Sequence, residues 1–106
     1  MTKYLIKASY TAEGVRGLMK SGGTNRRQAI EKMLTNVGGK LEAFYYAFGS
    51  HDVYAICSIP DTATAAAIVL SIKASGLVSI STTVLLEPGE IDAAKHIAVS
   101  YRIPGN

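Results

Sequence analysis

His51 and Asp52 stand side by side and form the sharpest candidate for catalysis in the sequence. A histidine changes charge near neutral pH, and a nearby carboxylate can raise its pKa and hold it ready to act as an acid or a base. Adjacent residues on an extended chain point to opposite sides, so the two side chains need not meet. The structural alternative is a turn, in which Gly49 supplies the unusual backbone conformation and Asp52 accepts hydrogen bonds from backbone amides. We favour the turn for Asp52.

A second set of candidates is aromatic. Tyr46 and Tyr54 are predicted to lie on one face of a β-sheet, near each other across two strands. Their rings and hydroxyl groups could bind an aromatic or enolic ligand. Lys7 is predicted on the same face, and Phe44 and Phe48 extend the set. The alternative, which we favour, is that these side chains line a subunit interface.

Arg26 and Arg27 are the candidates for anion binding. They follow two glycines in the run Ser21-Gly22-Gly23-Thr24-Asn25 and stand at the start of a predicted helix. Free amides at a helix start and two guanidinium groups suit an anion. No Gly-Lys-Ser/Thr follows at the spacing of a P-loop. A solvated loop that enters a helix is the simpler interpretation.

Metal and cofactor motifs are not found. The residues that most often bind metals, His51, His96 and Cys57, do not have the spacing of a metal site. The sequence also has no nucleophilic-serine elbow and no dinucleotide-binding fingerprint. We therefore expect no metal and no cofactor.

Composition favours one folded domain over residues 1–106. Hydrophobic residues make up 48% and charged residues 18% of the 106 residues, which is too apolar for a disordered chain. We see no signal peptide and no apolar run of membrane-spanning length. Cys57 is the single cysteine, which suits a reducing compartment, so we expect a cytoplasmic protein. Basic residues exceed acidic ones in residues 1–40 but are scattered, so nucleic acid is not an expected partner.

Hydrophobic periodicity, capping residues and turn residues predict the order of the elements. Thr11 can cap the first helix, Thr24 or Asn25 its second segment, and Asp61 the next helix. A four-residue connection predicts an antiparallel hairpin between the second and third strands. The order β-α-β-β-α-β is that of a ferredoxin-like α+β domain with a short terminal helix. The predicted strands are 4–10, 41–48, 53–59 and 77–86, and the predicted helices are 11–37 (interrupted at 21–23), 62–75 and 88–97.

Side-chain alternation predicts an unusual second face of the sheet. One face is aliphatic or small and should lie beneath the two main helices. The other is predicted to carry Phe44, Tyr46, Phe48, Tyr54 and Ile56 among hydroxyl groups and one lysine. A sheet covered on one side is normally polar on the other, so we expect a second copy of the chain or a ligand to cover this face. The alternative is that the terminal helix and tail fold back over it.

The run Phe48-Gly49-Ser50-His51-Asp52-Val53-Tyr54-Ala55-Ile56, followed by Pro60-Asp61, resembles the signature of the GYD domain family. Tyr10-Thr11-Ala12-Glu13-Gly14, the Arg26-Arg27 pair and Gly38-Gly39-Lys40-Leu41-Glu42 follow that family's order of features. The resemblance covers roughly Tyr4 to Glu90. This chain has His51 where the family usually has a tyrosine. The resemblance implies a dimeric α/β barrel, in which two sheets pack face to face.

Three functions remain open at this point. The first is a homo-oligomeric ligand-binding or structural module, with a pocket or an interface at the aromatic sheet face and an aromatic or anionic small molecule as its ligand. The second is a cofactor-independent oxygenase or isomerase of the dimeric α/β-barrel type, acting on an aromatic or polyketide-like substrate. The third is a regulatory oligomer that binds a metabolite through Arg26 and Arg27. We favour a protein that is not an enzyme, and we expect no membrane partner.

Overall fold

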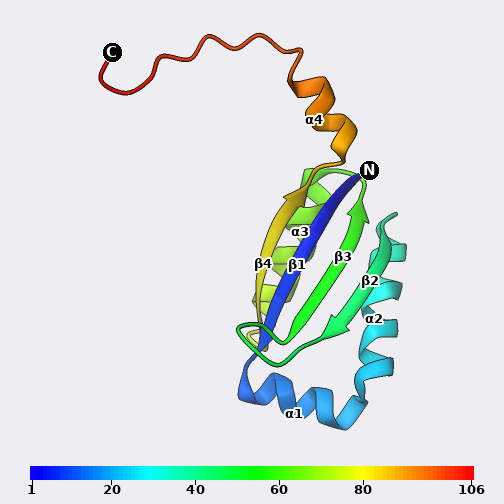
Figure 1. Cartoon of the computed structure of the whole chain (residues 1–106). Coiled ribbons are helices and arrows are strands. Elements are labelled where there is room, and N and C mark those ends of the chain that lie inside the picture. The colour runs from blue at the N-terminus through cyan, green and yellow to red at the C-terminus, as the bar shows by residue number, and fades with distance from the viewer.

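The computed structural model describes residues 1–106 as one four-stranded antiparallel sheet with helices on one side (Figure 1). The predicted order of strands and main helices is confirmed. Helices α2 and α3 cover the rear of the sheet in Figure 1, and the front of the sheet carries no helix. The elements are β1 (Thr2–Tyr10), α1 (Ala12–Ser21), α2 (Gly23–Asn36), β2 (Lys40–Tyr46), β3 (Val53–Ile59), α3 (Thr62–Ala74), β4 (Val78–Leu85) and α4 (Pro88–Ala94).

Capping residues set most of the helix boundaries. The Thr11 hydroxyl accepts a hydrogen bond from the Gly14 amide at 3.1 Å, as an N-cap should. The Asp61 carboxylate does the same for the Thr64 amide, and this bond lowers the pKa of Asp61. The second cap prediction is wrong: α2 begins at Gly23, without a side-chain cap, directly after Gly22. Gly22 separates α1 from α2 because its φ of 87° is readily adopted only by glycine.

The strands are ordered β2-β3-β1-β4, so β2 and β4 form the two edges of the sheet. β2 and β3 pair as the predicted antiparallel hairpin, with Leu41 opposite Cys57. The next pair joins Ala43 to Ile56, so Glu42 is an extra residue in β2. This β-bulge places two residues of one strand against one of its neighbour and reverses the alternation beyond it.

The bulge moves two aromatic side chains to the other side of the sheet. Beyond Glu42, Phe44 pairs with Ala55 and Tyr46 pairs with Val53, both of which face the helices. The predicted placement of Phe44 and Tyr46 on the open face is therefore wrong. Tyr45 takes their place, opposite Tyr54.

Phe48 also lies away from the predicted sheet face. β2 ends at Tyr46, and Phe48 belongs to the connection that leads to β3, where its ring is fully exposed. Extended alternation does not apply to residues outside the strand, so the predicted face of Phe48 is wrong as well.

The core lies between the sheet and helices α2 and α3. Its buried cluster includes Tyr4 from β1, Leu34 from α2 and Ala65 from α3. No large side chain is completely buried, and the Tyr4 hydroxyl is enclosed without a hydrogen-bond partner. The cluster comprises Tyr4, Leu34, Leu41, Ala55, Cys57, Ile59 and Ala65.

The last part of the chain stands away from this body. α4 continues from the end of β4, and residues 95–106 extend beyond it without regular structure (Figure 1). The radius of gyration is 17.1 Å, whereas a compact domain of this length has about 13 Å. The terminal segment therefore does not cover the open face of the sheet. No helix of the chain has both the length and the apolar character needed to cross a membrane.

Two phenylalanine variants test the reversal caused by the bulge. Phe44→Ala should lower the free energy of unfolding by about 3 kcal/mol, because the ring packs against the core. Phe48→Ala removes the same ring from a fully exposed position, so it should change the free energy of unfolding by less than about 0.5 kcal/mol. Urea titration followed by circular dichroism measures both. Equal losses in the two variants would contradict the assigned faces.

Candidate functional site

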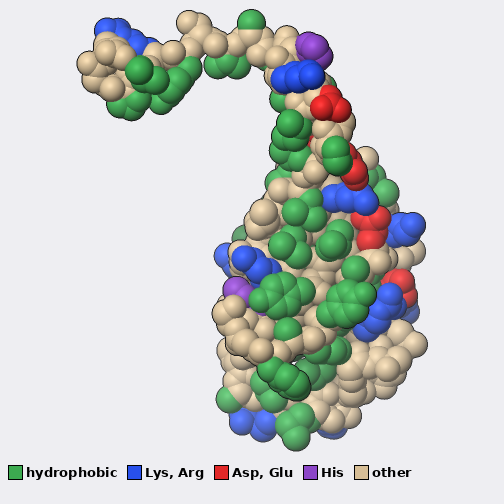
Figure 2. Space-filling view, in the orientation of Figure 1, with side chains coloured by type: hydrophobic (Ala, Val, Ile, Leu, Met, Phe, Trp, Pro, Cys, Tyr) green, Lys and Arg blue, Asp and Glu red, His purple; other side chains and the backbone are tan.

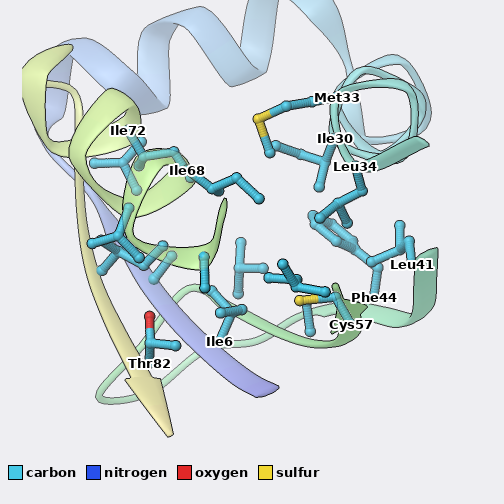
Figure 3. A pocket seen from close by; sticks show the side chains of 18 of the residues that line it. Ile6, Ile30, Met33, Leu34, Leu41, Phe44, Cys57, Ile68, Ile72 and Thr82 are labelled. Carbon is cyan, nitrogen blue, oxygen red and sulfur yellow. The ribbon is translucent and has the colours of Figure 1, made fainter. Parts of the chain in front are cut away.

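An apolar pocket lies between α2, α3 and the sheet (Figure 3). Eighteen of its twenty lining residues are hydrophobic, and its volume is about 70 Å³. Helix side chains enter it from both flanks, and strand side chains form its floor, as Figure 3 shows. A cavity needs roughly 10–15 Å³ to hold one water molecule, so this space is larger than an ordinary packing defect. The labelled helix residues are Ile30, Met33 and Leu34 from α2 and Ile68 and Ile72 from α3.

Arg26 is the one charged residue that lines this pocket. It belongs to the first turns of α2 and is half-buried. Its guanidinium group forms none of the ion pairs in the structure, whereas Arg27 pairs with Glu31 one turn further at 3.4 Å. The predicted arginine pair is therefore divided. Arg26 joins the pocket, and Arg27 lies on another side of the helix.

Tyr46 positions the start of α2. Its hydroxyl donates a hydrogen bond to the Gly23 carbonyl at 3.0 Å, and its ring meets Phe44 edge-on with 5.2 Å between centroids. Burial raises the pKa of Tyr46, the nearby Tyr10 adds to the rise, and the positive charge of Arg26 opposes it. Tyr46 thus connects β2 to the helix turn that carries Arg26.

Cys57 belongs to the floor of the pocket. Its side chain is buried, and burial raises the pKa of the thiol from 9.0 to about 11, with a further contribution from the Glu42 carboxylate. The thiol is therefore neutral at physiological pH and behaves as a small apolar side chain.

The open face is the second candidate surface, which we define as Leu5, Lys7, Tyr45, Tyr54 and Ile56. Tyr54 stands between Tyr45 on β2 and Lys7 on β1, and Ile56 pairs with Leu5 in the next row. The ring of Tyr45 is 69% exposed. Figure 2 shows hydrophobic side chains gathered on this face, with charged groups along both of its borders. The predicted shared face of Tyr54 and Lys7 is confirmed, but Tyr46 is not part of it.

The side chains of His51 and Asp52 have different partners. The His51 ring packs edge-on against Tyr54, with 5.8 Å between centroids, and its Nδ1 is enclosed without a hydrogen-bond partner. The Asp52 carboxylate accepts a hydrogen bond from the Tyr10 amide at 2.8 Å. The backbone-bonding role of Asp52 is confirmed, although its partner lies on β1 and not in its own turn. Catalysis by His51 stays a prediction.

A polar cluster holds the bulge at one end of the open face. The Glu42 carboxylate accepts hydrogen bonds from the Ser58 hydroxyl at 2.8 Å and from the Lys3 ammonium at 3.1 Å. These two bonds lower the pKa of Glu42, and the same carboxylate raises the pKa of Lys3. Glu87 lies 3.6 Å from the Lys3 ammonium. Glu42 therefore has partners on both β1 and β3 at the position where β2 bulges.

The pocket is the feature that sequence reasoning missed, and α2 carried a signal for it. Arg26, Ile30, Met33 and Leu34 occur at i, i+4, i+7 and i+8, which is one face of a helix. A charged residue that begins an apolar stripe marks the border of a buried surface. The structure positions no group of three or more His, Cys, Asp or Glu side chains to hold a metal ion.

The fold is of the ferredoxin-like α+β class, and the profile of the GYD domain matches residues 4–94. The chain therefore belongs to the GYD domain family, as the resemblance implied. Among solved structures, the crystal structure of MtbAldR aligns with a TM-score of 0.60 and 17% identity, over 81% of this chain and 52% of that one. Such a likeness shows the fold alone, and this chain spans about half the length of MtbAldR. Among proteins with curated descriptions, none matches the sequence.

Alkylation of Cys57 tests the closed floor of the pocket. A pKa of about 11 leaves roughly 100-fold less thiolate at pH 8 than the ordinary value of 9.0 would. Iodoacetamide should therefore modify the folded protein at least 100-fold more slowly than the protein in urea, with a rate that rises steadily with pH. Mass spectrometry measures both rates. Equal rates at pH 8 would contradict a buried thiol.

Proposed function

We propose that this GYD domain protein binds a small apolar molecule with an anionic end in the pocket between α2 and α3. The observation that carries the proposal is the arrangement of one charged residue, Arg26, on an otherwise apolar pocket. The apolar part of the ligand would replace empty space beside Ile30 and Ile68. Its carboxylate would pair with the guanidinium group, which otherwise lacks a counterion.

Pocket size and chemistry limit the ligand. A space of about 70 Å³ holds only a few carbon atoms, so a short apolar carboxylate fits better than a large ring system. Empty apolar cavities stay dry, and filling one restores dispersion contacts that its lining lacks. A guanidinium–carboxylate pair at a half-buried site forms charge-assisted hydrogen bonds, which are stronger than neutral ones. These properties favour an anionic ligand over a neutral one of the same length.

Hexanoate and hexanamide are matched probes for this site. In the unmodified protein, hexanoate should shift the methyl resonances of Ile30 and Ile68, and hexanamide should bind at least tenfold more weakly. Arg26→Gln should weaken hexanoate binding about tenfold, which corresponds to about 1.4 kcal/mol. Two-dimensional NMR titration measures each dissociation constant.

Arg27→Gln is the matched control for these titrations. It removes the same charge from the neighbouring residue, which pairs with Glu31 and does not line the pocket. Hexanoate affinity should therefore remain unchanged in this variant. If hexanoate shifts no pocket resonance, or if both variants weaken it equally, the proposed site is wrong.

A second candidate role is self-association through the open face. The specific observation is that two cross-strand pairs lie side by side on the side of the sheet that no helix covers. The pairs are Tyr45 with Tyr54 and Ile56 with Leu5. Full burial of one such side chain contributes about 1.5–3 kcal/mol. The burial of several of them beneath a second copy would therefore offset much of the free-energy cost of association. A second copy fits because it presents the same tyrosine and aliphatic side chains, and two such faces can stack as in sheet-on-sheet packing.

Two arginine substitutions test whether the open face, and not the adjoining loop, mediates self-association. Tyr45→Arg adds a charge within the apolar rows and should convert an oligomer into smaller species, because stacking would bury that charge. Phe48→Arg makes the same change at a fully exposed position outside the strand and should leave the mass unchanged. Light scattering after gel filtration measures the masses. A monomeric unmodified protein at high concentration would refute association through this face.

A further inference from the structure

The terminal segment has the alternation of a β-strand. We call residues 95–106 the arm. Apolar residues recur at every second position along it, and Ala98, Ser100 and Arg102 stand between them. This period places the four large apolar side chains on one side of an extended chain. The recurring apolar residues are Ile97, Val99, Tyr101 and Ile103.

The arm leaves this apolar row uncovered. The four side chains are between 57% and 79% exposed, and the arm has no regular structure. In Figure 1 it runs away from the sheet and from all of the helices that pack on it. An alternating segment of this kind gains stability only when a partner covers its apolar side and pairs with its backbone.

A complementary trough lies on the outer flank of α3. Helix α3 is apolar around most of its circumference, and Lys73 is its one charged residue. A helix of this kind is normally covered on more than one side. Its outer flank borders an open trough of about 460 Å³, in which the Leu70 side chain is 66% exposed. The other apolar walls of the trough are Ala65, Ala66, Val69 and Ile80.

The trough runs beside an unprotected sheet edge. β4 pairs with β1 alone, so its outer side is an unpaired edge, and the strand contains no charged residue and no proline. The opposite edge, β2, has Lys40 and Glu42 and a bulge. Charges and bulges on an edge strand discourage pairing with another chain. β4 therefore accepts an added strand more readily than β2 does.

We propose that the arm of one copy adds as a fifth strand along β4 of a second copy of this chain. The row from Ile97 to Ile103 would enter the trough beside Leu70. Seven extended residues span about 23 Å and the eight residues of β4 about 26 Å, so the lengths agree. Its own β4 is an unsuitable partner, because α4 directs the arm away from the body of its own copy. This surface is distinct from the open face, and it shares four lining residues with the pocket, namely Ala65, Val69, Ile80 and Thr82.

Photo-crosslinking between full-length copies tests the proposal. A mixture of ¹⁴N- and ¹⁵N-labelled protein is prepared with p-benzoylphenylalanine in place of Val99, which lies on the apolar side of the arm. The adjacent Ser100, on the opposite side, receives the same group as the control. After irradiation, mass spectrometry of peptides identifies the linked positions and shows whether both isotopes are present.

The expected product links position 99 of one isotopic copy to residues 65–82 of the other. Its yield should be at least fivefold higher than the yield of the same link from position 100. Leu70→Asp, an exposed change in the trough, should remove most of this product, whereas Ser71→Asp should not. The crosslink does not depend on the open face, so it should persist in Tyr45→Arg. Links within one copy, links to the open face or to α2, or no link would each overturn the proposal.

Discussion

The structure depends on one extra residue in an edge strand. Glu42 bulges out of β2, and its carboxylate is held by Ser58 on the adjacent strand β3 and by Lys3 on β1 beyond it. Because side chains alternate along a strand, this insertion decides the side for every later residue of β2. Phe44 consequently lines the pocket on the helix side, and Tyr46 donates a hydrogen bond to the Gly23 carbonyl at the start of α2. Tyr45 remains on the open face.

Most of the secondary structure follows from local sequence. Thr11, Asp61 and Gly22 mark helix boundaries through hydrogen bonds and dihedral angles that neighbouring residues determine. The face of the β2 aromatics could not be predicted in the same way. Residues 41–48 show no local break, and the partners that hold Glu42 are distant in the sequence. A bulge stabilised by tertiary contacts has no local signature, so strict alternation gave the wrong face.

The candidate site illustrates the same limit. Sequence reasoning identified Arg26, because helix starts and guanidinium groups suit anions, but it paired this residue with Arg27. The structure separates them, since neighbours on a helix point in different directions, and Glu31 neutralises Arg27. His51 and Asp52 are divided for a comparable reason, with one against Tyr54 and the other on the Tyr10 amide. Adjacency in sequence was thus a poor guide to adjacency of functional groups.

The bulge turns the Phe44 ring toward the helices. Nuclear Overhauser effects from the Phe44 ring protons test it most directly, because they report contacts within about 5 Å in solution. Cross-peaks are expected to the methyl groups of Leu34 on α2, with which Phe44 lines the pocket. Cross-peaks from Phe44 to Ile56 and Tyr54 on the open face, without any to α2, would contradict it.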